Sequence, residues 1–231
     1  MQNIDIFQEV DLFRTLNIPN EFGGNIDFDD FDVVEDWCEI QSGHFNKKFS
    51  YFHGVSKVCF LFEDYDWVAK IPFNGYECCV WEEDDEEKFY WEEFNINGVN
   101  DFCNEELLNY EHAMELGIER FFAETRYFCS TKNNHPIYIQ EKITPVANDK
   151  EERTPSEVSL SKINNKYNRT GCDKTWLASA LDFYGEELFE RFLDFINEKH
   201  PEIGRDLHYR NVGYRKDGSP CVLDFSGFGS I

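Results

Sequence analysis

Residues 204–228 read GRDLHYRNVGYRKDGSPCVLDFSGF, and this stretch decides the fold class. Asp206, Asn211 and Asp224 follow one another at separations of five and thirteen residues. A short strand pattern over residues 221–223 leads into Asp224, and the turn sequence KDGS precedes it. We therefore predict a loop, a hairpin and a strand end that present three oxygen ligands. Proteins hold magnesium in this way when the ion carries a nucleotide's phosphates.

Two motifs in this stretch resemble those of a known superfamily. The sequence DLHxxN beginning at Asp206, followed by DFSG beginning at Asp224, resembles the catalytic loop and the metal-binding loop of the protein-kinase-like superfamily. The sequence DLH is closer to that of aminoglycoside and choline phosphotransferases than to that of protein kinases. Small bacterial and phage-type kinase-like proteins have a similar pair of motifs. The resemblance implies Asp206 as the catalytic base, Asn211 and Asp224 as magnesium ligands, and ATP as the nucleotide.

The same resemblance implies an α+β fold, namely a bilobal protein-kinase-like fold with an antiparallel-sheet N-lobe and a truncated, mainly helical C-lobe. We expect the N-lobe, with an N-terminal extension and an acidic insertion, over residues 1–140, and the hinge and minimal C-lobe over residues 141–231. Gly204 departs from protein kinases, which have the histidine of His-Arg-Asp at this position. Because only seven residues follow Asp224, we expect neither an activation segment nor the helices with which kinases bind their acceptors.

The composition limits the partners of the chain. Its 231 residues suit one medium domain or two lobes that share a cleft. The net charge of -24 argues against nucleic acid as a partner, because an excess of carboxylates repels phosphates and releases no counterions. A nucleotide must therefore meet a local cluster of lysines and metal. Most of the acids are expected to keep a chain with 23 phenylalanines soluble, and an acidic partner-binding face is the alternative.

Cysteine usage and hydropathy predict a cytoplasmic location. The eight cysteines form no C-x-x-C pair and no zinc spacing. Their even number permits disulfides, but no signal peptide accompanies them, so reduced and mostly buried thiols are expected. No apolar run approaches the ~18 residues of a membrane span, so no membrane partner is expected.

The first part of the chain predicts one helix and one irregular segment. Apolar residues at spacings of three and four predict a short amphipathic helix over residues 4–16. Residues 17–39 include a Gly-Gly pair and the acid-rich sequence DFDDFD. We expect a solvated edge here. A calcium loop is the alternative, although the glycine and the final glutamate of an EF-hand are missing.

Residues 49–73 predict three strands joined by tight turns. In the last of them, residues 67–71, alternation puts Lys70 on the sheet face opposite Trp67 and Ala69. A buried ammonium group is costly unless it is paired or holds an anion. Lys70 is therefore expected to have an acidic or phosphate partner.

This segment also resembles the nucleotide-binding strands of kinases. The sequence VAKI, which contains Lys70, is similar to the kinase VAIK strand, with its lysine one position early. Gly54, Ser56 and Lys57 would then form the phosphate-covering turn through main-chain N–H groups, a hydroxyl and an ammonium group. Protein kinases have GxGxxG there, whereas this turn has one glycine. An ordinary hairpin with an exposed lysine is the alternative for Lys57.

A helix predicted over residues 104–116, capped by Asn104 or Asp101, supplies the candidate partner of Lys70. By resemblance to small-molecule kinases this partner is Glu106. Glu111 is the alternative, because it fits a second alignment to the glycine turn that follows. Either glutamate can instead be an ordinary solvated acid of the helix.

Two polar segments are expected to lack regular structure. Residues 77–91 contain the run EEDDEE, which predicts a solvated, inserted loop that can also serve as a contact face. Residues 147–174 are rich in Asn, Lys, Ser and Thr, which is typical of a mobile linker or lid. A strand is predicted at 137–140 and helices at 176–184 and 186–199, whose aromatic residues are expected in the core rather than around a cofactor.

In the kinase-like arrangement, the strand at 137–140 leads into the hinge between the lobes. Main-chain carbonyl and N–H groups of Glu141 and Ile143 would form hydrogen bonds with the edge of the adenine ring. The assignment depends on the order of the elements, because main-chain contacts say little about side-chain identity.

Three functions are compatible with these residues. The first is an ATP- and magnesium-dependent phosphotransferase that acts on an unknown small-molecule or protein acceptor. The second is a nucleotide-binding pseudokinase or protein-interaction module without phosphotransfer, which the missing acceptor helices favour. The third is transfer of AMP or another group on the same scaffold. A purely structural role remains for each motif alone, since an Asp can cap a turn and DFSG can form a tight turn after a strand.

Overall fold

The computed structural model describes residues 6–27, 31–45, 49–54, 56–83, 86–93, 102–149, 153–167 and 172–226. The chain divides into two compact units. Unit 1 consists of Met1–Cys103 and Arg126–Gln140, and unit 2 consists of Asn104–Thr125 and Glu141–Ile231. The expected N-lobe over residues 1–140 included residues 104–125, which the structure assigns to unit 2. The reason is that the buried residues of this segment belong to the hydrophobic core of unit 2, among them Ala113, Ile118, Phe121 and Phe122.

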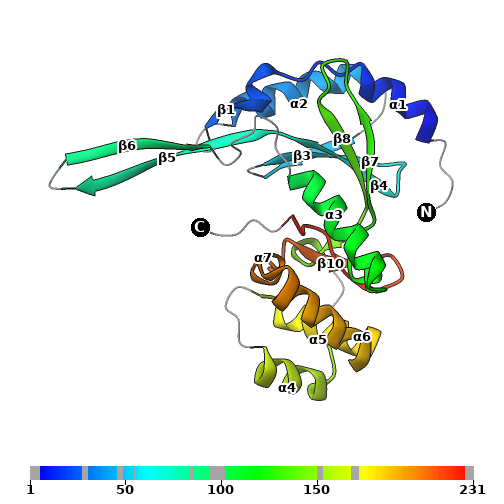
Figure 1. Ribbon diagram of the computed structural model, residues 1–231. Coiled ribbons are helices and arrows are strands. Elements are labelled where there is room, and N and C mark those ends of the chain that lie inside the picture. Colours follow the sequence, from blue (N-terminus) through cyan, green and yellow to red (C-terminus); the bar gives the residue numbers. More distant parts are fainter. Residues whose placement is uncertain are drawn as a thin grey trace. The chain divides into compact units, whose positions relative to one another are not determined.

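Unit 1 contains a five-stranded sheet with the strand order β2-β3-β4-β8-β7 (Figure 1). These strands are β2 (Phe49–His53), β3 (Lys57–Phe62), β4 (Trp67–Pro72), β8 (Pro136–Glu141) and β7 (Thr125–Ser130). β3 pairs antiparallel with both β2 and β4. The three strands predicted between residues 49 and 73 are confirmed, as is the strand at 137–140, whereas β7 has no counterpart in the prediction.

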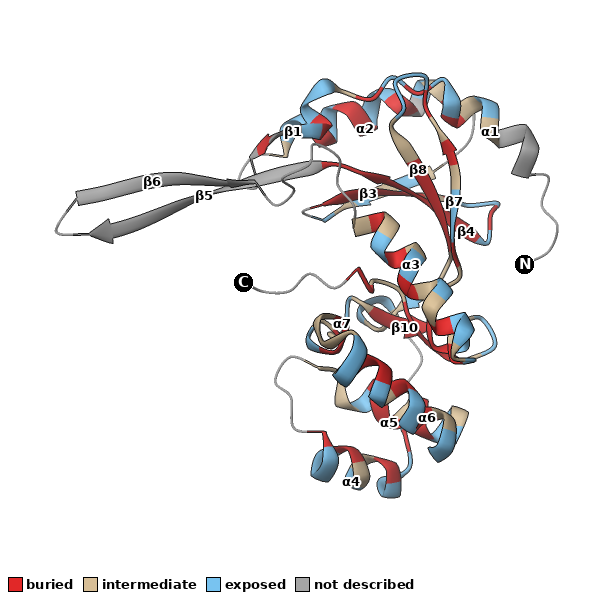
Figure 2. Cartoon of the chain, viewed as in Figure 1, coloured by how far each residue is buried: buried red, intermediate tan, exposed pale blue. Residues whose placement is uncertain are grey.

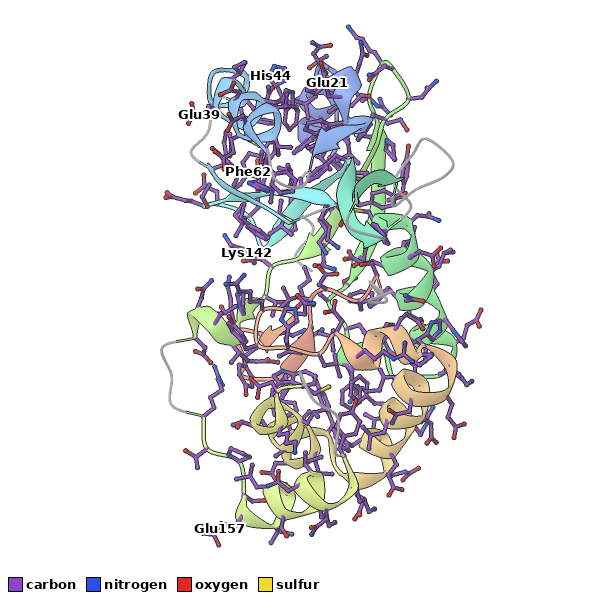
Figure 3. The ribbon with its side chains drawn as sticks, turned by 90° about the vertical axis from the view of Figure 1, so that its left-hand side faces the viewer. Glu21, Glu39, His44, Phe62, Lys142 and Glu157 are labelled. Atoms are coloured by element: carbon purple, nitrogen blue, oxygen red, sulfur yellow. The ribbon has the colours of Figure 1, made fainter. Side chains whose placement is uncertain are left out.

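One face of this sheet carries the hydrophobic core of unit 1. Alternate residues of β3, β4 and β8 contribute to it and are buried, namely Val58, Phe60, Phe62, Trp67, Ala69, Ile71, Ile137 and Ile139. Helices α1 (Ile6–Arg14) and α2 (Asp32–His44) pack on the same core (Figure 1). β4 is buried along its whole length (Figure 2). Phe62 lies in the interior, whereas Glu21 and Glu39 point outward (Figure 3).

Helix α2 corrects the expectation of a solvated edge over residues 17–39. Its acids are exposed, namely Asp32, Glu35, Asp36 and Glu39, whereas Val34, Trp37 and Cys38 are buried. Helical spacing places the two sets on opposite faces, which a count of acids along the sequence does not reveal. The same segment includes a 3-10 turn, η1 (Asn20–Phe22), and a strand, β1 (Gly23–Asp27). Residues 28–30 of the alternative calcium loop lie outside the described residues. The helix predicted over residues 4–16 is confirmed by α1.

Strands β5 (Asn74–Glu83) and β6 (Glu86–Glu93) form an antiparallel hairpin, and β1 pairs parallel with β5. The expected solvated loop over residues 77–91 is therefore wrong. Residues with high strand propensity interrupt the acids, namely Tyr76, Val80, Trp81, Phe89, Tyr90 and Trp91. The register sets glutamates opposite one another in the pairs Glu77–Glu92, Glu82–Glu87 and Glu83–Glu86.

Unit 2 is mainly helical. Its helices are α3 (Phe102–Glu115), α4 (Glu157–Lys166), α5 (Lys174–Tyr184), α6 (Glu186–Asp194), the π-helical turn Phe195–Lys199 and α7 (Pro201–Arg205), with 3-10 turns η2 (Glu119–Phe121) and η3 (Val146–Asn148). A small sheet has the order β11-β10-β9, formed by β9 (Thr144–Pro145), β10 (Val212–Tyr214) and β11 (Pro220–Val222). The helices predicted at 104–116, 176–184 and 186–199 are confirmed.

The aromatic residues of α6 belong to the core, as predicted. Phe189 and Phe192 are buried. The ring of Phe192 stacks on that of Phe121, with centroids 4.4 Å apart and planes inclined by 9°. Nε1 of Trp176 donates a hydrogen bond to the carbonyl of Gly213 at 2.9 Å, which connects α5 to the small sheet.

Helix α4 corrects the expectation of a linker or lid over residues 147–174. Ser156 caps the helix, since its Oγ accepts a hydrogen bond from the N–H of Ser159. Asp182 of α5 accepts hydrogen bonds from Oγ of Ser156 at 2.8 Å and from Oγ of Ser159 at 2.6 Å. The polar residues that suggested a linker therefore cap α4 and attach it to α5. Residues 150–152 and 168–171 lie outside the described residues.

Six cysteines form no disulfide, namely Cys38, Cys59, Cys103, Cys129, Cys172 and Cys221, and all but Cys172 are buried. Burial, with a smaller effect of Glu35, raises the pKa of Cys38 to about 12. Burial also raises the pKa of Cys129 to about 11 and raises that of Cys221. Such thiols stay protonated at neutral pH. Separately, none of the helices in the described ranges is long and apolar enough to cross a membrane.

Gly213 in β10 allows the strands of the small sheet to approach one another. It pairs with Pro145 of β9 and Cys221 of β11. A Cβ atom at this position would lie 2.8 Å from the carbonyl carbon of Thr144 and 2.9 Å from Cγ2 of Ile143. Backbone atoms cannot give way without moving a strand, so glycine is required by close approach.

We expect Gly213→Ala to lower the free energy of unfolding by about 2–3 kcal/mol, because the added methyl group overpacks a contact made by backbone atoms. Urea unfolding followed by tryptophan fluorescence measures the loss. Gly43→Ala is the matched control, since a Cβ there meets nothing within 4 Å and alanine favours the helix. A loss in Gly213→Ala no larger than in the control would contradict the close-approach argument.

Two histidines predict a pH dependence of stability. Burial lowers the pKa of His135 below 6.5, although a hydrogen bond to the Pro72 carbonyl opposes the shift. Burial also lowers the pKa of His200, with Glu202 opposing it. Just below pH 6.5 the unfolded chain therefore binds more protons than the folded chain, and stability is lost as the pH falls. We expect a lower free energy of unfolding at about pH 5.5 than at about pH 7.5. The loss should be smaller in His135→Gln, and an equal loss would argue against this cause.

Candidate functional site

The loop between α7 and β10 brings Asp206 and Asn211 together. Nδ2 of Asn211 donates to Oδ2 of Asp206 at 2.7 Å and to the Asp206 carbonyl at 3.1 Å. The loop is closed by hydrogen bonds from the Asp206 N–H to the Ile203 carbonyl at 3.0 Å and from the Asn211 N–H to the His208 carbonyl at 2.8 Å. The Asp206 side chain is 27% exposed, so a reacting hydroxyl can reach its carboxylate.

His208 faces the other carboxylate oxygen of Asp206. The N–H of Arg210 donates to Nδ1 of His208 at 3.2 Å, so Nδ1 is an acceptor and the proton of the neutral ring is on Nε2. Nε2 lies 3.4 Å from Oδ1 of Asp206. Burial lowers the pKa of His208, against an opposing effect of Asp224. The neutral ring is therefore favoured.

Asp224 is attached to the same loop through the backbone of Asn211. The Asn211 carbonyl accepts a hydrogen bond from the Asp224 N–H at 3.4 Å. Oγ of Ser226 donates to Oδ1 of Asp224 at 3.2 Å. Nδ2 of Asn109 in α3 donates to the Phe225 carbonyl at 2.8 Å. The three polar residues predicted from the order of the motifs therefore lie in one part of unit 2, and the strand end that carries Asp224 is held from two sides.

These donors fit a magnesium ion that is shared with phosphates. Asp224 offers a carboxylate, and Asn211 offers Oδ1, since its Nδ2 is turned toward Asp206. Magnesium in such sites takes one or two carboxylates and completes its shell with water and substrate phosphates. Among the described residues, no three His, Cys, Asp or Glu side chains lie close enough to hold a metal ion.

Helix α3 places Glu106 on its buried face and Glu111 on its exposed face. Glu106 is 0% exposed, and Asn109, three residues later on the same face, is 4% exposed. A wholly buried carboxylate requires a partner, whereas an exposed one does not. Burial thus separates the two glutamates that the sequence left as alternatives. Asp101, one of the two candidate caps, lies outside the described residues.

The sheet face opposite the core of unit 1 carries two buried lysines. Lys57 is 6% exposed and Lys70 is 3% exposed. Trp67 and Ala69 belong to the core on the other face, so the predicted alternation is confirmed and an exposed Lys57 is excluded. The register of β3 and β4 makes the two lysines diagonal neighbours, with Cα atoms roughly 7–8 Å apart. Two buried ammonium groups at this spacing call for negatively charged partners.

The turn before β3 differs from the expectation at one donor. The N–H of Gly54 donates to the Lys57 carbonyl at 3.0 Å, so this group closes the turn. Ser56 is buried, and its carbonyl accepts from the N–H of Phe73 at 2.9 Å. Val55 lies outside the described residues. The hydroxyl of Ser56 and the ammonium group of Lys57 stay as the candidate phosphate contacts of this turn.

The two hinge residues belong to unit 2. The N–H of Glu141 donates to the Glu124 carbonyl at 2.8 Å, so this N–H is already used within the protein. Both carboxylate oxygens of Glu141 accept from Nε of Arg215, at 2.9 and 3.0 Å. Ile143 is half-buried and lies next to Gly213. The hinge is therefore attached to the hairpin of β10 and β11.

Arg215 is the residue of this region that the sequence did not reveal. Its Nη1 donates to the Arg120 carbonyl at 2.8 Å and its Nη2 to the Phe122 carbonyl at 2.9 Å. Its side chain is 18% exposed. The one signal in the sequence is an arginine directly after a strand. Its partners lie 74, 95 and 93 residues away, so no local pattern identifies them.

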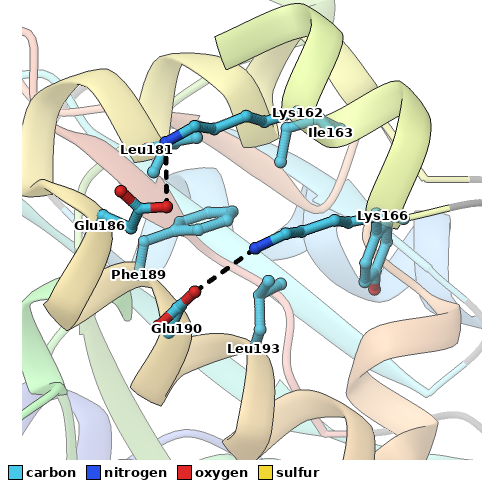
Figure 4. Close-up of a pocket in the computed structure, with 9 residues that line it drawn as sticks. Lys162, Ile163, Lys166, Leu181, Glu186, Phe189, Glu190 and Leu193 are labelled. Carbon is cyan, nitrogen blue, oxygen red and sulfur yellow. Dashed lines mark hydrogen bonds and ion pairs between the residues drawn. The ribbon is translucent and has the colours of Figure 1, made fainter.

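A small groove between α4 and α6 is a second candidate site (Figure 4). Nζ of Lys162 lies 2.9 Å from Oε1 of Glu186, and Nζ of Lys166 lies 3.5 Å from Oε1 of Glu190. The cavity has a volume of about 30 Å³, which is room for about one water molecule. The groove is therefore too small for a nucleotide.

Comparisons with solved structures show structural similarity to this mixed α+β protein. No protein-family model matches the chain, and no curated protein matches it. Among solved structures, the chain is similar to the GDP and kanamycin complex of APH(2″)-IIIa, an aminoglycoside phosphotransferase. The sequence identity is 11% and the TM-score 0.31, over 83% of this chain and 72% of that chain. The proposals below therefore depend on the residues of this chain itself.

We expect Arg215→Met to lower the free energy of unfolding by about 2–3 kcal/mol, because the Glu141 carboxylate and two carbonyl groups lose their donor. Arg215→Lys keeps the charge but lacks the planar set of N–H donors of the guanidinium. Its free energy of unfolding should therefore lie between those of Arg215→Met and the wild type. Arg120→Met is the matched control, since its exposed side chain takes no part in these hydrogen bonds. Denaturant unfolding measures all three variants, and equal stabilities of Arg215→Met and the control would rule out the proposed anchor.

Proposed function

We propose that this protein is an ATP- and magnesium-dependent phosphotransferase with a bilobal, kinase-like fold. The observation that carries the proposal is the hydrogen bond of 2.7 Å between Asn211 and Asp206, in a loop whose Asn211 carbonyl also accepts from the N–H of Asp224. A candidate base and two candidate metal ligands thus lie together, in the chain order of kinase-like enzymes. The sheet of unit 1 and the helices of unit 2 are consistent with that class.

Asp206 is proposed to accept the proton of the acceptor hydroxyl. Its Oδ2 has Nδ2 of Asn211 as a donor, and its Oδ1 faces Nε2 of His208, so the carboxylate is held in one orientation. The hydroxyl oxygen forms a bond to the γ-phosphorus of ATP while the bond from that phosphorus to the β–γ bridging oxygen breaks. ADP leaves with the electron pair of that bond, and the hydroxyl proton passes to Asp206.

The other proposed roles concern the nucleotide. Asn211 and Asp224 hold the magnesium ion, which neutralises phosphate charge when it is bound. Lys70 is proposed to bind phosphate oxygens, and the burial of its side chain supports this role. The remaining contacts are proposed for Ser56 and Lys57 in a turn shaped by Gly54, and for main-chain groups of Glu141 and Ile143 at the adenine edge.

We expect ATP with magnesium at 100 times its Kd to raise the melting temperature of the wild type by about 5–10 °C. Asp224→Asn and Lys70→Met should lose most of this shift, because each removes a phosphate or metal contact. Asp64→Asn is the matched control, since Asp64 is an exposed acid in the turn between β3 and β4. Absence of any shift in the wild type would rule out the nucleotide site.

Labelled ATP then distinguishes transfer from binding alone. Asp206→Asn should keep the shift in melting temperature but transfer the γ-phosphate about 10²–10⁴-fold more slowly. Transfer that is unchanged in Asp206→Asn would refute its role as the base. Binding of ATP without transfer of the γ-phosphate would identify a nucleotide-binding module. Transfer of the labelled α-phosphate to the acceptor would identify AMP transfer.

A further inference from the structure

We infer that the acceptor carries a carboxylate or phosphate group and that Arg210 and Tyr209 bind this group. The inference deepens the proposed function and rests on it, because it concerns the molecule that presents its hydroxyl to Asp206. The charge, exposure and hydrogen bonds of the loop at residues 206–211 carry it.

The loop that contains Asp206 reverses the charge of the chain. The whole sequence has 46 acids against 22 Lys and Arg. Residues 204–216 instead contain one acid, Asp206, against Arg205, Arg210, Arg215 and Lys216, of which Arg215 is paired with Glu141. Positive charge that is concentrated beside a candidate base raises the local concentration of anions.

Arg210 differs from the arginines that have structural roles. Arg153 lies 2.6 Å from a carboxylate oxygen of Asp149, and Arg215 lies 2.9 Å from one of Glu141. Over the described ranges, by contrast, no carboxylate oxygen lies within 4.0 Å of the Arg210 guanidinium. Its paired N–H donors are positioned to take the oxygens of a ligand.

Tyr209 orients the Arg210 side chain. The guanidinium carbon lies 5.6 Å from the centroid of the Tyr209 ring, within the range of a cation–π interaction. The backbone under the pair is held in place, since the Tyr209 carbonyl accepts from the N–H of Ala147 at 3.1 Å and the Arg210 N–H donates to Nδ1 of His208 at 3.2 Å. Tyr209 is 49% exposed. A guanidinium held in this way can bind a carboxylate or phosphate through two parallel hydrogen bonds.

The same hydrogen bonds place the backbone of Arg210 close to the candidate base. The imidazole of His208 accepts from the Arg210 N–H on one side, and its Nε2 lies 3.4 Å from Oδ1 of Asp206 on the other. One ring therefore separates the Arg210 backbone from the Asp206 carboxylate. An acceptor whose hydroxyl meets Asp206 brings its neighbouring substituent to Arg210. A cationic substituent, although attracted by the net charge of the chain, would meet like charge there.

The test uses four compounds with one three-carbon frame: glycerate, glycerol 3-phosphate, glycerol and 3-amino-1,2-propanediol. Each is added at equal concentration and ionic strength to the protein with ATP and magnesium, and the transfer of labelled γ-phosphate is measured. We expect transfer to at least one of the two anionic compounds to be at least about tenfold faster than to glycerol or the amine. The comparison of glycerate with glycerol 3-phosphate distinguishes a carboxylate from a phosphate ligand.

Variants test whether the Arg210 side chain causes the preference for anionic acceptors. Arg210→Gln should reduce transfer to the anionic compound at least about tenfold, and Arg210→Lys should reduce it less. Arg120→Gln, which removes an exposed charge elsewhere in unit 2, should leave the preference unchanged. The shift in melting temperature with ATP checks that each variant still binds the nucleotide.

Three outcomes would overturn the inference while the ATP shift remains: no labelling of either anionic compound, a preference for glycerol or the amine, or an anionic preference unchanged in Arg210→Gln. Absence of the ATP shift in the wild type would instead overturn the proposed function itself.

Discussion

The hydrogen-bonded ion pair between Arg215 and Glu141 fixes the part of unit 2 on which the candidate site depends. One guanidinium binds both oxygens of Glu141 and the carbonyls of Arg120 and Phe122. It thereby joins the hairpin of β10 and β11, the segment that begins at Glu141, and the aromatic turn η2. The loop of Asn211 and the strand end of Asp224 flank this hairpin. Their spacing therefore depends on a partly buried contact that water cannot easily replace.

Unit 1 shows a division of roles between the faces of its sheet. One face packs aromatic and aliphatic side chains against α1 and α2, and this accounts for its stability. The other face buries Lys57 and Lys70, and a buried ammonium group requires a negatively charged partner, either a carboxylate of the protein or a bound anion. Positions at which a sequence breaks the rules of burial are expected to be functional. The lysines are therefore the residues of unit 1 to which the proposed role in phosphate binding is assigned.

The sequence allowed prediction of the elements whose periodicity is undisturbed, such as the three strands at 49–73 and the helix at 186–199. It was wrong for α2 and the hairpin of β5 and β6, because charge runs concealed a helical or strand pattern. It was also wrong for α4, because the polar residues that cap this helix are typical of linkers as well. Asp206, Asn211 and Asp224 could be found from their order. Arg215 could not, since its partner Glu141 lies 74 residues away and long-range side-chain pairs leave no local pattern. The sequence does contain a signal for Gly213, because a glycine within a strand often marks a close approach of another part of the backbone.

The reactivity of the buried thiols reports local and global unfolding of the chain. Burial raises the pKa values of Cys38 and Cys129 in unit 1 and of Cys221 in unit 2. The thiolate is the species that reacts with alkylating and oxidising agents, so these cysteines are protected both by exclusion of the reagent and by a shortage of the reactive form. Modification therefore requires local or global unfolding. Because each unit holds such a thiol, the order in which they become reactive records which unit opens first.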